Sequence, residues 1–162
     1  HGSSAASDVY KRQILACTSS GGLGGSSYPL HELEELEPEE KIKLSLMIND
    51  LRINDAWIEN NQEQWKLLKL QAQTKTVFKP DRENLLKQLL ARKDHDTFDS
   101  LKDINIPVFL LGGKYDGIAP MSNMEIIHNK VKDSKLEFYE GGHLFLIQDP
   151  EAFKDIIKWL SR

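Results

Sequence analysis

Two polar residues, Asp116 and His143, each follow a short apolar run with glycines at its end, and both are suited to proton transfer. Asp116 lies in the sequence GGKYDG, and His143 lies in EGGHLF. An ionised Asp can accept the Nδ1–H of an imidazole, which fixes the tautomer and stabilises the imidazolium formed when the His takes a proton. The pair therefore predicts the acid and the base of a nucleophilic triad.

Each residue also has a structural interpretation. An Asp after a strand is commonly a turn or helix-cap residue, and a His after two glycines is often a loop residue held by hydrogen bonds. The order Asp before His and the spacing of one strand–helix unit favour the catalytic interpretation, because one known triad runs Ser, then Asp or Glu, then His along the chain.

Alternating strands and helices in the last third of the chain must position this pair. The apolar run Ile106–Gly113 is typical of a parallel strand buried on both faces. We expect a helix over 121–132, a strand over Leu136–Tyr139 and a closing amphipathic helix over Pro150–Leu160. Parallel strands end at the same edge of a sheet, so the loops carrying Asp116 and His143 should lie side by side. The closing helix is expected to turn four apolar residues inward: Phe153, Ile156, Ile157 and Leu160.

The earlier part of the chain predicts one strand followed by several helices. Ile14–Thr18 is a short apolar run that enters the glycine-rich segment 19–27. That segment lacks the Lys-Ser/Thr of a phosphate-binding loop. Residues 29–98 have helical spacing, with helix starts expected at Pro29 and Pro38. Three aromatic residues there could line a pocket, but their spacing favours the core: Trp57, Trp65 and Phe78.

The first 13 residues, HGSSAASDVYKRQ, have no period of 2 or 3.6, and the chain does not begin with Met. The segment SDVYKRQ resembles translated sequencing-adapter read-through. We predict a non-native or disordered tail over 1–13.

Composition narrows the class of protein. The 162 residues are 40% hydrophobic and 28% charged with a net charge of -4, and the two signs of charge are mixed along the chain. This composition predicts a globular protein and gives no basis for a nucleic-acid partner. Cys17 is the only cysteine, so an intrachain disulfide is excluded, and no apolar run is long enough to predict a membrane span. We expect a cytoplasmic protein without a membrane partner.

The segment Ile104–Leu160, with IPVFLLGGKYDGIAP and LEFYEGGHLFLIQDPEAFKDIIKWL, resembles the last two strands and helices of the α/β-hydrolase fold, in its esterase and enol-lactone hydrolase branch. ILACTSSGG resembles the strand that leads into the helical cap of that branch. The resemblance implies an α/β fold with few parallel strands and flanking helices. Its C-terminal core half would comprise 14–27 and 99–162, and its cap 28–98.

The same resemblance implies roles for particular residues. Asp116 matches the triad acid and His143 the triad base. His95 and Asp96 lie where the cap joins the core, and a structural role is favoured for them. No cofactor-binding residue and no metal site is implied, and the partner is a small-molecule substrate.

The chain departs from the pattern at the nucleophile. The elbow G-x-S-x-G should precede Ile14 by roughly one helix, and these 162 residues do not contain it. The sequence at Gly24–Tyr28 fails at its last position. The oxyanion-hole donors would also lie upstream. The identity of the nucleophile is therefore unknown, and we expect this chain to be inactive alone.

The sequence thus predicts the C-terminal fragment of a serine hydrolase acting on a small carboxylic ester or lactone by a Ser-His-Asp triad. One alternative is the same fold with an Asp nucleophile, as in dehalogenases, or with carbon–carbon bond hydrolysis. Another is a non-catalytic ligand-binding protein of this fold. Strand Ile14–Thr18 would lie beside a further strand, so we also expect self-association through an exposed sheet edge.

Overall fold

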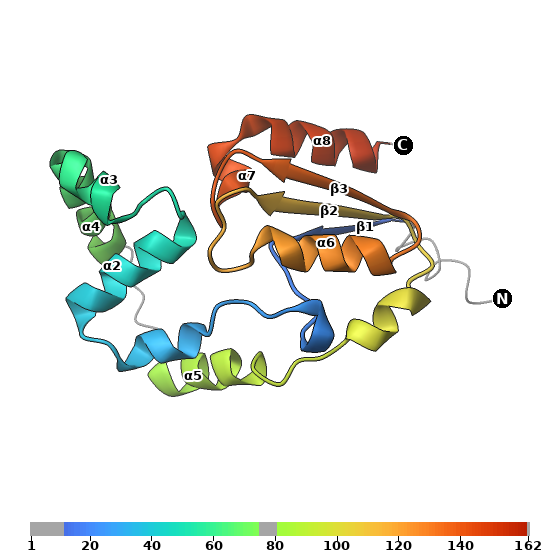
Figure 1. The fold of residues 1–162 in the computed structure, drawn as a ribbon, viewed down its shortest axis with the longest axis horizontal. Coiled ribbons are helices and arrows are strands. Elements are labelled where there is room, and N and C mark those ends of the chain that lie inside the picture. Colours follow the sequence, from blue (N-terminus) through green and yellow to red (C-terminus); the bar gives the residue numbers. More distant parts are fainter. Residues whose placement is uncertain (1–11, 75–80, 162) are drawn as a thin grey trace.

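A computed structural model describes residues 12–74 and 81–161. Its centre is a three-stranded parallel sheet in the order β1-β2-β3, formed by Gln13–Ala16, Val108–Gly113 and Ser134–Tyr139 (Figure 1). Gln13 pairs with Val108, and Val108 pairs with Ser134. The sheet therefore joins a strand near the start of the chain to two strands more than 90 residues later.

All six residues of β2 are buried, because helices cover both faces of this strand. Val108 and Leu110 pack with helix α6, Met121–Lys130, whereas Phe109 and Leu111 face the other side. That second side is covered by α7, Phe145–Gln148, and α8, Pro150–Leu160 (Figure 1). The apolar run of β2 thus reflects burial on both faces, as its sequence predicts.

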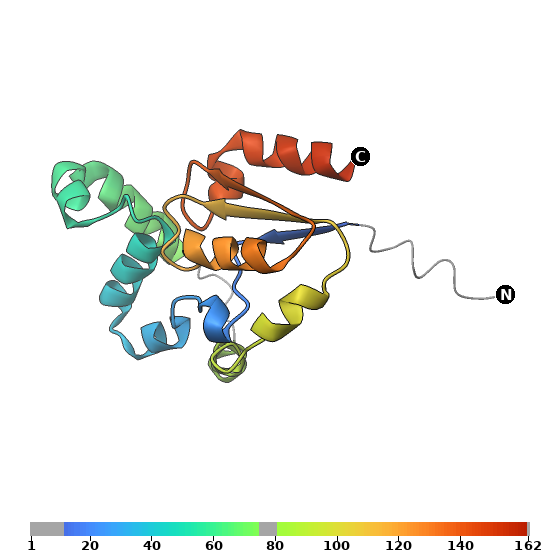
Figure 2. The same ribbon diagram turned by 45° about the vertical axis from the view of Figure 1, so that its right-hand side comes forward.

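The segment between β1 and β2 is mostly helical and lies to one side of the sheet (Figures 1 and 2). It contains the 3₁₀ helices Gly22–Gly24, Leu30–Glu35 and Phe98–Asp103. Its α-helices are α2, Pro38–Asn49; α3, Asp55–Asn60; α4, Gln62–Thr74; and α5, Arg82–Ala91. Helix α2 begins at Pro38, as expected, because proline has no N–H to lose at a first helical position. Its residue Ile48 packs with Leu33 and Ile118, which joins this segment to the loop after β2.

Most of the expected elements are present, with small shifts at their ends. Strand β1 begins at Gln13 and ends at Ala16, helix α6 ends at Lys130, and α8 has the expected bounds. The short helix α7 was not expected. Trp65 is buried in the core, as its spacing favours, whereas Phe78 and most of the predicted tail lie outside the described residues. The expected division into core and cap stays a prediction.

The predicted inner face of α8 is wrong at three positions. Phe153, Ile157 and Leu160 are exposed, and the residues that α8 buries are Ala152 and Trp159. Ile156 does pack against the core cluster that contains Trp159. The large indole of Trp159 fixes which side of the helix faces the sheet. The predicted inner face did not include Trp159.

Among the described residues, no helix combines the length and the apolar character that crossing a membrane requires.

Candidate active site

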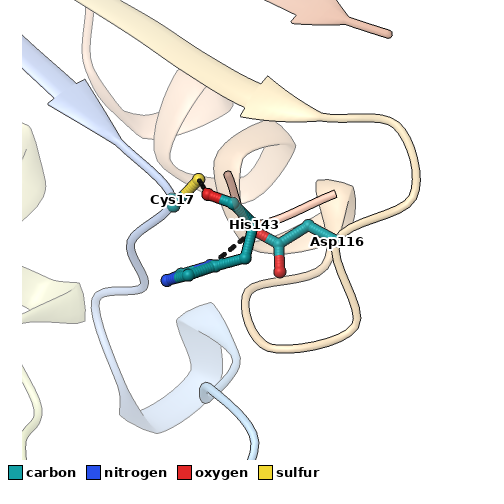
Figure 3. A group of neighbouring side chains, drawn as sticks. All are labelled: Cys17, Asp116 and His143. Atoms are coloured by element: carbon teal, nitrogen blue, oxygen red, sulfur yellow. Dashed lines mark hydrogen bonds and ion pairs between the residues drawn. The ribbon is translucent and has the colours of Figure 1, made fainter. Parts of the chain in front are cut away.

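Asp116 and His143 lie together beyond the carboxyl ends of β2 and β3 (Figure 3). The imidazole Nδ1 lies 2.9 Å from Oδ2 of Asp116, and an Nδ1–H donates to that oxygen. The Asp116 side chain is completely buried, whereas the His143 side chain is 31% exposed. An enclosed acid and a partly accessible imidazole are the arrangement in which the acid orients the base and the base meets a reactant.

The Asp116 carboxylate is also held by the backbone of its own loop. Oδ1 accepts the N–H groups of Ile118 and Ala119, each at 2.8 Å. Burial alone raises the pKa of this carboxyl, but the hydrogen bonds from His143 and Ala119 hold the pKa below its usual value. Oδ1 of Asp116 therefore makes the turn contact, and Oδ2 contacts His143 in the Asp116–His143 dyad. That this dyad is catalytic stays a prediction.

The two loops approach so closely that glycine is required between them. A Cβ on Gly113 would lie 2.0 Å from the carbonyl oxygen of Gly142. Past the last paired residues of β2 and β3, the N–H of Tyr115 donates to Gly141 O at 2.9 Å. The glycines that follow these strands in the sequence thus bring the acid-bearing loop against the base-bearing loop.

Helix α2 fixes both loops through the end of its backbone, a role that the sequence did not indicate. Ile48 O accepts the N–H of Gly117 at 2.9 Å, and Asn49 O accepts the N–H of His143 at 2.7 Å. The last carbonyls of a helix have no partner within it, so they are available for such contacts. No side-chain pattern reports a backbone contact of this kind.

Asp50, which follows α2, extends this attachment. Its carboxylate accepts both Nε and an Nη of Arg52, at 2.8 and 2.6 Å, and the side-chain amide of Gln148 at 3.0 Å. Burial raises the pKa of Asp50, but the hydrogen bonds from Arg52 lower it by more. The pKa of this carboxyl is therefore below its usual value. The Gln148 oxygen accepts the N–H of Gly142 at 2.8 Å. A chain of hydrogen bonds thus leads from α2 to the residue before His143.

Cys17 lies against the dyad from β1 (Figure 3). Its Sγ is 3.5 Å from the carbonyl oxygen of His143, and its backbone has a φ of 47°, which is unusual for a residue other than glycine. Burial, together with the negative charge of Asp116, raises the pKa of the Cys17 thiol to about 12. The thiol is therefore a neutral hydrogen-bond donor and not a nucleophile at neutral pH.

Cys17, Asp116 and His143 also form the one group of possible metal ligands among the described residues, with ligand atoms within 4.8 Å of one another. The donor set fits a metal poorly. Metal binding would need the thiolate, whose formation the site opposes, and Asp116 already uses both oxygens as hydrogen-bond acceptors.

A cavity of about 550 Å³ begins at Cys17 and extends toward α5. One wall is the segment after β1, and the other is the end of α5 with the residues that follow. The walls are joined where Thr97 N–H donates to Ser20 O at 2.7 Å and where Gly21 forms a bridge with Asp96. His143 is not among the lining residues, so the cavity meets the dyad only through Cys17. The lining comprises Cys17, Thr18, Ser19, Gly21, Gly22, Ser26, Ser27, Tyr28, Pro29, Leu30, His31, Leu89, Ala91, Arg92, Lys93 and His95.

His95 and Asp96 have partners different from those of the Asp116–His143 pair. Oδ1 of Asp96 accepts the N–H of Phe98 at 3.0 Å, which is a turn contact. His95 lines the cavity, and its Nε2 is 3.4 Å from the hydroxyl of Thr97. The turn contact of Asp96 agrees with the structural role that the sequence favoured. His95 lines a cavity, and the sequence did not indicate this position.

Comparison with solved structures identifies the fold. A hydrolase from Pseudomonas aeruginosa PA01 is similar over 94% of this chain and 56% of its own, with 20% identity and a TM-score of 0.64. An esterase from Exiguobacterium antarcticum is similar over 94% and 57%, with 18% identity and a TM-score of 0.64. The enol-lactonase from Burkholderia xenovorans LB400 is similar over 96% and 58%, with 13% identity and a TM-score of 0.67.

The chain thus has part of the α/β-hydrolase fold, as its sequence predicts, and spans less than three fifths of the length of these structures. No protein-family model and no curated protein matches the sequence. At sequence identities of 13–20%, structural similarity establishes the fold only. The reaction depends on the residues of the site.

Proposed function

We propose that this chain is the C-terminal part of a serine hydrolase that cleaves a small carboxylic ester or lactone. The observation that carries the proposal is the 2.9 Å contact between Nδ1 of the partly exposed His143 and Oδ2 of the buried Asp116. The hydrolase, the esterase and the enol-lactonase of similar fold support the class of reaction.

In the proposed reaction, Nε2 of His143 takes the proton from a Ser hydroxyl as that oxygen attacks the substrate carbonyl carbon. The imidazolium then gives this proton to the leaving alkoxide, which leaves an acyl-enzyme. Water attacks the acyl group, its proton passes to Nε2, and the released serine oxygen takes that proton back. Asp116 stays ionised throughout and holds the ring in position, consistent with its lowered pKa.

The proposal places the nucleophile outside these 162 residues, which contain no G-x-S-x-G. We therefore expect this chain to hydrolyse p-nitrophenyl acetate no faster than its His143→Ala variant. Turnover above that variant would contradict the placement.

The decisive experiment is an independent read of the DNA upstream of the Ile14 codon, followed by expression of the extended protein. A G-x-S-x-G about one helix upstream, with activity abolished by His143→Ala, would support the serine hydrolase. An Asp at that turn would instead identify dehalogenase-type chemistry. Absence of any nucleophile would make the chain a ligand-binding protein and overturn the proposal.

A further inference from the structure

The charged side chains that line the cavity next to the dyad are all cationic. Arg92 and Lys93 both line it, with His31 and His95, and the described lining residues include no Asp or Glu. Asp94 is exposed and does not line the cavity, and the Asp96 carboxylate, which lies against Gly22, accepts the N–H of Phe98. The lining itself therefore carries two cations, Arg92 and Lys93, and no carboxylate.

The two cations are available to a ligand. Neither Arg92 nor Lys93 has an ion pair or a side-chain hydrogen bond within residues 12–74 and 81–161. Arg92 stands at the C-terminal end of α5, where its own backbone N–H is satisfied by Leu89 O. A guanidinium offers a planar fork that fits a carboxylate, and an ammonium adds three donors.

The remainder of the lining fits a short organic ligand with a polar end. Hydroxyl groups come from Thr18, Ser19, Ser26, Ser27 and Tyr28, whereas Leu30 and Leu89 supply apolar contact. A volume of about 550 Å³ lies within the usual range of small-molecule sites. The end near Cys17 adjoins the dyad, and the cations come from the opposite wall, at the end of α5.

We propose that the substrate is an ester or lactone that carries a second, free carboxylate, bound by Arg92 and Lys93 while the scissile carbonyl lies toward His143. This inference rests on the proposed function for its reactive end, and on the charge of the cavity for its anionic end. A half-ester of a short dicarboxylic acid has both features.

Isothermal titration of the 162-residue chain at constant ionic strength tests the anionic end without any turnover. Monomethyl glutarate is the anionic probe, and dimethyl glutarate is the neutral probe of the same chain length. We expect the half-ester to bind at least about fivefold more tightly, a modest factor because both cations are exposed and screened by solvent. Equal affinity for the two probes, or no binding of either, would overturn the inference.

A double variant, Arg92→Gln/Lys93→Gln, should lose the preference for the half-ester and keep its thermal melting temperature, since both side chains are exposed. The matched control is Lys132→Gln, which removes one exposed cation from the segment between α6 and β3, at the far end of the sheet from the dyad. If the double variant retains the preference, or the control loses it equally, Arg92 and Lys93 are not the carboxylate site.

The two proposals fail separately. An extended protein that hydrolyses the neutral diester as well as the half-ester would retain the serine-hydrolase function and lose the anionic substrate. A chain that prefers the half-ester but whose extended form hydrolyses no ester would lose the function and retain the carboxylate site.

Discussion

Replacing Gly142 by Ala tests whether the backbone end of α2 positions the base. The new Cβ would lie 1.9 Å from Asn49 O, 2.8 Å from the Cα of Asp50 and 2.9 Å from the Asn49 carbonyl carbon. All three are backbone atoms, so no side-chain rotation relieves the contact. Since carbon and carbonyl oxygen approach to about 3.3 Å, the end of α2 must separate from the loop by roughly 1.4 Å.

That displacement would break the bond from His143 N–H to Asn49 O, which is 2.7 Å long, because a contact beyond about 3.5 Å is no longer a hydrogen bond. We expect Gly142→Ala to lower the free energy of unfolding by about 1–3 kcal/mol, the usual cost of forcing a methyl group into a packed site. Urea unfolding measures this change. Proton NMR should also show weakening of the downfield Nδ1–H signal of His143.

The matched control is Gly112→Ala, at the end of β2. Its Cβ would meet the Phe138 ring at 3.0 Å, and a ring edge can move by a few tenths of an ångström more easily than a backbone can. We expect a smaller loss of stability and an unchanged Nδ1–H signal. If Gly142→Ala unfolds within about 0.5 kcal/mol of the parent chain with its Nδ1–H signal intact, α2 does not hold the loop as argued.

Three further predictions concern the dyad, the thiol and the sheet edge. The folded-state pKa of Asp116 is lowered, so its stabilisation is present above the unfolded pKa of about 3.9 and disappears as pH falls through the folded value. Asp116→Asn should therefore reduce the urea midpoint at pH 7, and the difference should shrink below about pH 4; a pH-independent difference would refute the linkage. Because the Cys17 pKa is raised to about 12, the folded chain should react with Ellman's reagent at pH 8 at least about 100-fold more slowly than the urea-unfolded chain, and similar rates would contradict the burial argument. Within the described residues β1 pairs only with β2, and the chain should therefore self-associate with concentration in sedimentation velocity runs, whereas a monodisperse monomer would exclude association through that edge.

The residues of the dyad could be predicted from the sequence because their signals are local. A continuous apolar run followed by glycines identifies a buried parallel strand, and two such units in succession bring the following loops to one edge of a sheet. Asp116 and His143 therefore lie together as expected, at 2.9 Å. The absence of a nucleophile elbow from these residues is likewise read directly from the sequence.

The tertiary structure alone decided how that pair is held and what adjoins it. The C-terminal end of α2 and the loops of the dyad are some 65–95 residues apart in the sequence. They meet through backbone groups, which every residue has, so the residue types there do not predict the contact. The inward face of α8 depends on where Trp159 finds space against Phe109. The basic cavity arises because the segment after β1 and the end of α5 are joined at Ser20 and Thr97, a long-range contact that local periodicity cannot encode.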